Sequence, residues 1–389
     1  MNDTAYTDLV GQSSAVDAVQ AAARDAHRPG GGVGVMTHAW LITGPPGSGR
    51  SNLAYAFASA LLSEGGETDP RVRAQVDART HPDLAVLASE RVTITIEEVR
   101  RLVTASQYSP SVARYRVMVV EDADRMTERT SNVLLKALEE PPERTVWILC
   151  APSEADLLPT IRSRVRVVRL RVPEPREVAE LLVQRDGVDS ATALRAAEEA
   201  QSHIGMAHRL ATDGEARERR EETIRIALGA DTVPKAVRGA QRLLDVAKAD
   251  STALNQERDA AERARALASM GVPEGGAVPP QLRSVLKQME EDQKRRATRG
   301  LRDGVDRVLV DLLSVWRDVL LLQLDAGLAP VNAARRGDVQ ALASATRPQA
   351  TLEVLEAIAE ARRRLPANVP PLLALEAMLI TAALSRTPR

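Results

Sequence analysis

Residues 39–53, AWLITGPPGSGRSNL, decide the fold that this sequence predicts. The run AWLIT is typical of a buried strand, the turn GPPGSG is rich in glycine, and a helix-forming run follows from Arg50. A strand, a glycine-rich loop and a helix in this order form a phosphate-binding loop, with the pattern G-x-x-x-x-G-K-[ST] met at Gly44, Gly49 and Ser51. Glycines let successive backbone N–H groups turn towards a phosphate, and the helix N-terminus adds partial positive charge.

The loop supplies the candidate ligands of ATP or ADP with Mg²⁺. They are Gly44, Pro45, Pro46, Gly47, Ser48, Gly49, Arg50 and Ser51. Ser51 would offer its hydroxyl to the Mg²⁺ ion, whereas Arg50 stands where the pattern requires lysine. A guanidinium is a planar fork rather than a compact ammonium, so we expect nucleotide binding with poor hydrolysis. The alternative is a chance turn before a helix, but context and spacing favour the phosphate loop.

Composition narrows the class of protein. The 389 residues carry 52 Lys and Arg against 53 Asp and Glu, a net charge of −1, so no global field draws the chain to nucleic acid. Aromatic residues make up 2%, which argues against platforms for stacking bases. The single cysteine, Cys150, lies in an apolar run and is expected to be a packed core thiol, so neither a disulfide within the chain nor a cysteine-ligated zinc site is expected.

The sequence also predicts where the protein resides. No apolar run approaches the length of a membrane span, and the start MNDTAYTDLV lacks the pattern of a signal peptide. We therefore expect a soluble cytoplasmic protein.

Strands alternate with helices over residues 1–172, which predicts a doubly wound α/β domain with a parallel sheet. Further strands are expected at 83–87, 117–120, 145–151 and 165–170, and helices at 52–62, 96–107 and 127–139, whereas 63–80 is polar and irregular. From residue 173 only helices are expected: a three-helix lid at 173–216 and an all-helical domain at 217–389. Segments 27–34 and 271–280 are rich in glycine and are expected to form loops. The charge-dense run 287–302 favours a solvated helix face over a DNA-touching surface.

Two acids, Glu121 and Asp122, follow the buried strand at 117–120. Acids in this place after a phosphate loop usually position Mg²⁺ and polarise the attacking water. Because the shorter Asp stands where a longer Glu normally reaches the water, we expect that second role to be weak. The alternative is that the acids only stabilise the N-terminus of the following helix.

Two further residues are candidates for contact with phosphate. Ser153 follows the strand TVWILCA and could hydrogen-bond a γ-phosphate or its attacking water, although serine at a strand end is usually a turn former.

Arg164 is one of five arginines between Arg162 and Arg171. Composition alone favours an edge strand with solvated arginines. The turn Ser163–Arg164 instead favours a guanidinium that projects towards the nucleotide of a neighbouring subunit, where it would stabilise developing phosphoryl charge.

These motifs together resemble a known family. Residues 122–153, DADRMTERTSNVLLKALEEPPERTVWILCAPS, and residues 158–164, LPTIRSR, are similar to the delta-prime clamp-loader subunits of bacterial DNA polymerase III, within the AAA+ superfamily. The resemblance is closest over residues 40–170 and weak in the helical half. It implies an AAA+ domain with a RecA-like sheet, a lid and a collar domain that joins the subunits.

The sequence departs from that family at several positions. Arg50 replaces lysine, the acidic pair Glu121–Asp122 is inverted, and Val165 replaces the cysteine of a Ser-Arg-Cys motif but leaves Arg164 in place. His208 stands where a second sensor arginine is expected. The family's zinc-binding cysteines are missing from residues 63–80, so no zinc is expected.

The resemblance implies a stator, a subunit that hydrolyses little ATP itself but completes a neighbour's site through Arg164. Its partners would be gamma/tau motor subunits and a delta subunit, with the sliding clamp and primer-template DNA reached through the assembly and no membrane involved. A competent gamma/tau-like motor ATPase is the alternative, supported by the otherwise intact loop and Ser51. A small-molecule kinase with a helical tail is a third, which the Ser163–Arg164 turn and the collar-like half argue against.

Overall fold

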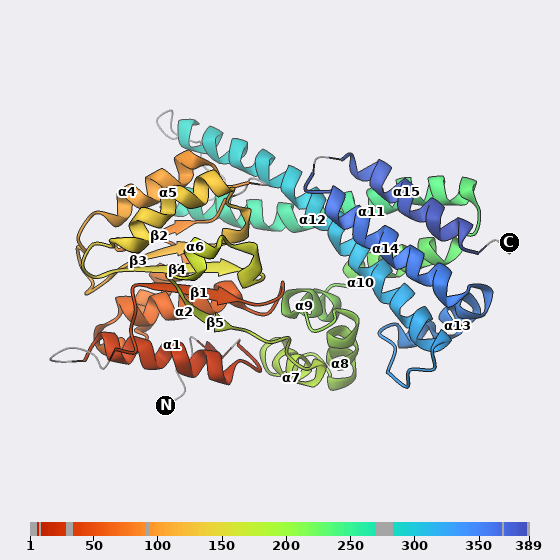
Figure 1. Ribbon diagram of the computed structural model, residues 1–389, viewed down its shortest axis with the longest axis horizontal. Coiled ribbons are helices and arrows are strands. Elements are labelled where there is room, and N and C mark those ends of the chain that lie inside the picture. Colours follow the sequence, from red (N-terminus) through yellow and green to blue (C-terminus); the bar gives the residue numbers. More distant parts are fainter. Residues whose placement is uncertain are drawn as a thin grey trace. The chain divides into compact units, whose positions relative to one another are not determined.

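The computed structural model describes residues 6–7, 9–28, 34–89, 93–269, 283–367 and 369–386 (Figure 1). For the helical residues 254, 257, 258, 260–269 and 283–299 it describes the backbone alone. The expected loop at 271–280, most of the loop at 27–34 and the side chains of the charge-dense run up to residue 299 therefore lie outside the described parts. The chain divides into two compact units, Met1–Thr212 and Asp213–Arg389.

The first unit is built on a sheet of five parallel strands in the order β2-β3-β4-β1-β5. The strands are β1 (Ala39–Thr43), β2 (Leu84–Leu87), β3 (Arg116–Val120), β4 (Thr145–Ala151) and β5 (Arg166–Arg169). β1 and β4 are buried along their whole length, as expected for central strands covered on both faces. Among the described residues β5 pairs with β1 alone and is an edge strand, which confirms the α/β fold class and the edge position.

Helices cover both faces of the sheet. Figure 1 shows α1 and α2 on one side and α4 and α5 on the other. Alternate strand residues separate accordingly: Trp40 and Ile42 pack in one apolar cluster, and Leu41 packs in the other. The helices of this layer are α1 (Ser13–Ala26), α2 (Arg50–Leu62), α3 (Pro70–Asp77), α4 (Ile96–Ser106), α5 (Glu128–Glu139) and α6 (Pro159–Arg162). The 3₁₀ turns η2 (Glu64–Gly66), η3 (Ala123–Arg125) and η4 (Glu154–Asp156) accompany them.

The expectation of irregular structure at 63–80 is wrong in part, because residues 70–77 form α3. Asp69 caps this helix through its Oδ1, which accepts the N–H groups of Arg71 at 2.6 Å and Val72 at 3.3 Å. Pro70 occupies the first helical position, where its missing N–H costs nothing. Val76 is fully buried and ties this polar helix to the core.

Three helices end the first unit, as the sequence predicts. They are α7 (Pro175–Asp186), α8 (Ser190–Glu199) and α9 (Ile204–Thr212). Their buried residues, among them Val178, Leu182, Ala197 and Leu210, form an apolar cluster separate from those of the sheet. We call α7–α9 the lid.

The secondary structure of the second unit is all helical within its described residues, with loops between the helices. Its elements are α10 (Gly214–Gly229), α11 (Val233–Ser269), α12 (Arg283–Gln323), η6 (Ala333–Arg335), α13 (Arg336–Ala345), α14 (Pro348–Arg364) and α15 (Pro371–Leu384). One large apolar cluster, which includes Leu309, Trp316, Ile358 and Leu375, holds them together. The domain boundaries at 172/173 and 216/217 stay predictions. Within the described residues, the helices lack the combination of length and apolar content that crossing a membrane requires.

Candidate functional site

The phosphate loop lies at the carboxyl edge of the sheet, between the ends of β4 and β5. Gly44 N donates to Pro152 O at 3.2 Å, just past the end of β4, and Leu170 N donates to Thr43 O at 2.7 Å, just past β5. Parallel α/β sheets bind their ligands at this edge. The tertiary structure therefore brings the loop beside Pro152 and Ser153, at the edge of the sheet where the acids that follow β3 also lie.

Gly47 and Gly49 have left-handed backbone conformations, with φ of 79° and 93°. A β-carbon built on Gly47 would lie 2.4 Å from the His203 ring, and one built on Gly49 would lie 2.7 Å from Leu9. Ile204 N also donates to Gly47 O at 3.4 Å. The loop is thus covered directly by the start of α9 and by the N-terminal segment, and only glycine fits beneath them.

Two polar atoms of the loop are buried without a hydrogen-bond partner among the described residues: Ser48 Oγ and Arg50 Nη1. Arg50 is the first residue of α2, and Ser51 is the second and is partly exposed. A buried, unpaired guanidinium nitrogen at a helix N-terminus is an arrangement that an anion would satisfy. The residues present therefore fit a phosphate group, with Ser51 as the hydroxyl available to a metal ion.

Glu121 is already engaged by two neighbours. The hydroxyl of Tyr55, on α2, donates to Glu121 Oε1, and Arg79 Nη2 donates to the same oxygen at 2.8 Å. Burial and the negative charge of Glu121 raise the pKa of Tyr55, so Tyr55 stays protonated and remains the donor. These bonds hold Glu121, the acid at the position that usually serves Mg²⁺, so its Oε1 already accepts two donors.

Asp122 is the N-cap of the 3₁₀ turn η3, and Asp124 lies within that turn. Asp122 adopts a left-handed conformation with φ of 50°, and its Oδ2 lies 3.5 Å from Arg125 Nε. Burial, and then the charge of Asp122, raise the pKa of Asp124, while the charge of Arg50 acts in the opposite direction. Asp124 therefore lies within electrostatic reach of the phosphate loop, a role that the sequence analysis did not assign to it.

Cys150, on β4, lies near the charged side chains of Arg50, Glu121 and Asp122. Its side chain is buried, and burial raises the pKa of the thiol to about 12. The charges of Arg50, Glu121 and Asp122 all act on it to a smaller extent. The structure thus places Arg50 of the loop and the acidic pair within electrostatic reach of Cys150, and the cysteine is the packed core thiol that was expected.

Ser153 is the N-cap of the 3₁₀ turn η4. Its Oγ accepts Ala155 N at 3.2 Å, and its own N–H donates to Asp156 Oδ2 at 2.9 Å. The exposed side chain stabilises a turn, which is the usual role of a serine at a strand end. Its contact with a γ-phosphate stays a prediction.

Arg164 lies just before β5, with 34% of its side chain exposed. Its Nη1 donates to Thr160 O at 2.7 Å and to Ser163 Oγ at 3.0 Å, and its Nη2 pairs with Glu139 Oε1 at 2.6 Å. The guanidinium is therefore held by three acceptors near the surface of the first unit.

The other arginines along β5 have different surroundings. Arg169 is exposed and pairs with Glu154, and Arg171 pairs with Glu177. Arg166 lies over the Trp40 ring, with its Cζ 5.0 Å from the ring centroid. These residues behave as the charged side chains of an edge strand.

In the lid, His208 Nδ1 lies 2.7 Å from Asp186 Oδ2. The residue at the expected position of the second sensor arginine is thus engaged inside the lid.

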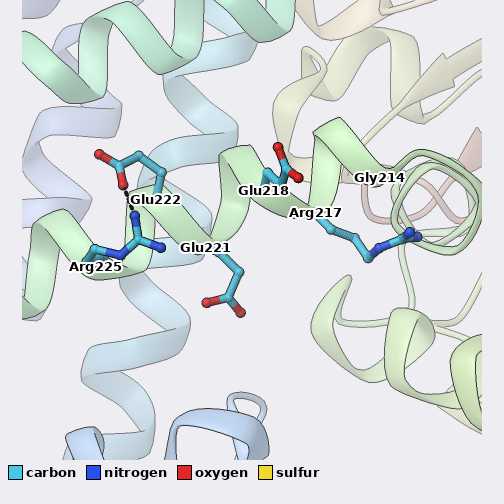
Figure 2. A pocket seen from close by; sticks show the side chains of 6 residues that line it. All are labelled: Gly214, Arg217, Glu218, Glu221, Glu222 and Arg225. Carbon is cyan, nitrogen blue, oxygen red and sulfur yellow. Dashed lines mark hydrogen bonds and ion pairs between the residues drawn. The ribbon is translucent and has the colours of Figure 1, made fainter.

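A hollow on the second unit lies along α10 (Figure 2). It is lined by Gly214, Arg217, Glu218, Glu221, Glu222 and Arg225. In Figure 2, Glu222 and Arg225 turn towards each other and form an ion pair. Glu222 also pairs with Arg242, and Glu221 pairs with Arg335 at 2.5 Å. Because Glu221 and Glu222 are paired with neighbouring arginines, we assign no ligand to this hollow.

Several residues of the site were missed from the sequence. Tyr55 lies one helical turn after Ser51, a spacing that points both residues to one face of α2 and that is visible in the sequence. Asp124 is visible as the second acid of the run EDAD. His203, Arg79 and Glu139 carry no local signal, because they reach the site only through the packing of the lid, of the segment after α3, and of α5.

Comparisons with known proteins agree with the resemblance. Residues 32–174 match a family described as "DNA polymerase III, delta subunit". The delta-prime subunits of Pseudomonas aeruginosa and Escherichia coli are each 35% identical over 158 and 167 residues, which cover 39% and 41% of this chain. The gamma/tau subunit of Mycobacterium tuberculosis is 31% identical over 186 residues, or 46% of this chain. The predicted resemblance to clamp-loader subunits is thereby confirmed for the N-terminal part.

The matches cover only part of each relative. This chain spans about half the length of the two delta-prime subunits, 48% and 50%, and 31% of the gamma/tau subunit. Among solved structures, a gamma subunit-related protein of Thermotoga maritima covers 96% of this chain and 99% of its own with a TM-score of 0.44 and 16% identity. Values this low do not establish a common fold over the whole chain.

Proposed function

We propose that this chain is a stator subunit of a bacterial clamp loader, similar to the delta-prime subunits, which helps to load a sliding clamp on primed DNA for the replicative polymerase. In this role it binds ATP or ADP without efficient hydrolysis. It supplies Arg164 to the nucleotide of a neighbouring gamma/tau-like motor subunit, and its helical unit joins that subunit and a delta subunit as a collar.

The proposal of weak hydrolysis is supported by the contacts of the acids Glu121 and Asp122. Asp122, which stands at the position of the water-orienting acid, has a shorter side chain than Glu and lies 3.5 Å from Arg125, while Glu121, at the Mg²⁺ position, is bound by Tyr55 and by Arg79 at 2.8 Å. Arg50 retains a positive charge at the phosphate but offers a wider, planar head than lysine. A nucleotide bound at this loop would stabilise the fold of the subunit and would not be turned over.

The role in a neighbour's site is carried by one observation: Arg164 lies partly exposed, with a guanidinium that defined hydrogen bonds hold in place. An arginine supplied from another subunit stabilises the charge of the phosphoryl group in transfer and is worth about 10³–10⁵ in rate. The motif around Arg164 falls within the residues that match the family.

The alternative function is a competent motor ATPase. It is supported by the identity of 31% to a gamma/tau subunit and by Arg50 Nη1, which is buried without a hydrogen-bond partner among the described residues and could bind a phosphate. The isolated protein distinguishes the two functions, because a motor turns over ATP without partners.

The first experiment measures nucleotide binding and steady-state ATP hydrolysis by the isolated protein, with and without Mg²⁺. Binding with negligible turnover is expected. Brisk turnover would favour the motor, and absence of binding would remove the structural nucleotide from the proposal and leave Arg164 as the functional group.

The second experiment uses the assembled loader and single-turnover ATP hydrolysis. Arg164→Ala should slow one phase of the progress curve by about 10³-fold, the phase of the motor site beside this chain. Arg50→Ala should slow hydrolysis much less, because its phosphate site is not the one that turns over. Arg169→Ala, a change in an exposed arginine of the same edge strand, is the matched control and should leave every phase unchanged. A larger effect of Arg50→Ala than of Arg164→Ala would overturn the stator assignment.

A further inference from the structure

The guanidinium of Arg164 lies where two helices end. The first, α5, ends at Glu139, and Pro141 and Pro142 stop it from continuing. The second, α6, ends at Arg162 with Ser163 as its C-cap. Nη2 of Arg164 pairs with Glu139 at 2.6 Å, and Nη1 donates to Thr160 O in α6 at 2.7 Å.

The position of the Arg164 guanidinium, at the C-terminal ends of α5 and α6, favours a positive charge. The C-terminus of a helix carries partial negative charge, so a carboxylate in the last turn of α5 is unfavourable on its own. The guanidinium of Arg164 offsets the charge of Glu139 and satisfies a carbonyl near the end of α6. The guanidinium is thus held in place by an acceptor on α5 through Nη2 and by an acceptor on α6 through Nη1.

We propose that Glu139 is a positioning residue for Arg164, which it holds in the orientation that meets the triphosphate bound to a neighbouring subunit. The inference rests on the proposed function, in which Arg164 acts on that triphosphate. A guanidinium already oriented before the subunits meet loses little freedom on docking, and such preorganisation contributes to rate rather than to binding.

A purely structural role for the pair is a weaker explanation. The side chains of Arg164 and Glu139 are 34% and 46% exposed, and ion pairs of this kind contribute little to folding stability. The loss of the Glu139 carboxylate should therefore leave the unfolding of the isolated chain unchanged, and any effect on the assembly would come from the orientation of Arg164.

The test is Glu139→Gln in the full chain, assembled with gamma-type and delta-type subunits and followed by single-turnover ATP hydrolysis. It should slow the same kinetic phase that Arg164→Ala slows, by about tenfold, because a misplaced catalytic group costs rate. The concentration of ATP that gives half the maximal rate should stay within about twofold, since the motor's own loop binds the nucleotide. Glu139→Asp, which keeps the carboxylate, should recover most of the rate.

Two controls accompany the test. Glu140→Gln changes an exposed neighbour at the C-cap of α5 and should leave the phase unchanged. In the double variant Glu139→Gln/Arg164→Ala the phase should be no slower than in Arg164→Ala alone, because Glu139 acts through Arg164.

The outcomes separate this inference from the proposed function. If Arg164→Ala slows the phase and Glu139→Gln leaves it unchanged or accelerates it, the positioning role is overturned and the proposed function stands. A further loss in the double variant also overturns the positioning role. If Arg164→Ala itself has no effect, the proposed function fails, and the inference fails with it.

Discussion

Asp83 shows how one buried side chain fixes the geometry around the strands. Its carboxylate is fully buried and accepts the N–H groups of Ser111 at 2.6 Å, Val112 at 2.8 Å and Ala113 at 2.8 Å. The Ser111 hydroxyl donates as well, at 2.8 Å, and Arg116 pairs with it at 3.3 Å. This residue therefore ties the start of β2 to the segment that leads into β3.

We expect Asp83→Asn to lower the free energy of unfolding by about 2–4 kcal/mol, because an amide cannot accept all of these donors and carries N–H groups of its own. Urea unfolding at pH 7 measures the change. Asp77→Asn is the matched control: its carboxylate forms an exposed pair with Arg73 on α3, and the expected change is at most about 0.5 kcal/mol. Similar losses in the two variants would contradict the role of Asp83.

The effect of Asp83 should depend on pH. Burial alone raises the pKa of Asp83, but the N–H groups of residues 111–113 and the Ser111 hydroxyl outweigh it and hold the pKa below its usual value. A lowered folded-state pKa means that the contribution to stability is complete above the unfolded pKa of about 3.9 and is lost as the pH falls through the folded value. The difference between wild type and Asp83→Asn should therefore be constant between pH 5 and 7 and shrink only in stronger acid.

At the scale of elements, the contact between α9 and the phosphate loop has the clearest consequence. His203 Nδ1 accepts Met206 N at 3.2 Å, so the ring is fixed at the start of α9. The same ring lies over Gly47, and Ile204 donates to the carbonyl of that glycine. The lid is thus docked on the loop through one ring and one backbone bond.

Gly47→Ala should lower the free energy of unfolding by about 2–4 kcal/mol, since its β-carbon would lie 2.4 Å from the His203 ring. The left-handed backbone adds strain of about 1 kcal/mol. Gly187→Ala isolates this second effect, because Gly187 has φ of 67° with no atom within 4 Å of the added carbon, and it should cost only about 1 kcal/mol.

Urea unfolding and limited proteolysis of the lid provide the measurements. The double variant Gly47→Ala/His203→Ala should be more resistant to proteolysis in the lid than Gly47→Ala, because the clash has been removed. Equal costs for Gly47→Ala and Gly187→Ala would contradict the contact between loop and lid.

The whole molecule has separate apolar cores in its two units, and its tryptophans are divided between them. Trp40 and Trp147 are buried in the first unit, and Trp316 is buried in the second. Units with their own cores can open independently. Fluorescence can therefore follow each unit of this protein separately.

Trp316→Phe should lower the urea midpoint of the second unit, with a loss of about 1–3 kcal/mol for the smaller side chain, and leave the first unit unchanged. Tryptophan fluorescence of this variant reports the first unit alone, while far-UV circular dichroism reports both. We expect a fluorescence midpoint that stays fixed while the dichroism curve develops an earlier transition. Coincident curves that shift together would mean that the units unfold as one.

The local sequence determined the strands, most helices and the phosphate loop of this protein. Glycines at 44, 47 and 49, the continuous apolar runs and caps such as Thr127 act within a few residues, so their effect can be inferred without the fold. The same holds for the order of strands and helices, which predicted a parallel sheet. Helix α3 was not predicted, because its cap, Asp69, precedes a short polar helix with one buried apolar residue, Val76.

Only the tertiary structure decided which partner each functional side chain meets. Glu121 is held by Tyr55 and Arg79, which lie 66 and 42 residues away in the chain, and Arg164 is held by Glu139 from another helix. His203 covers Gly47 because the lid folds back on the loop. Such contacts depend on how the elements pack, and packing brings together residues whose spacing in the sequence carries no period that could reveal them.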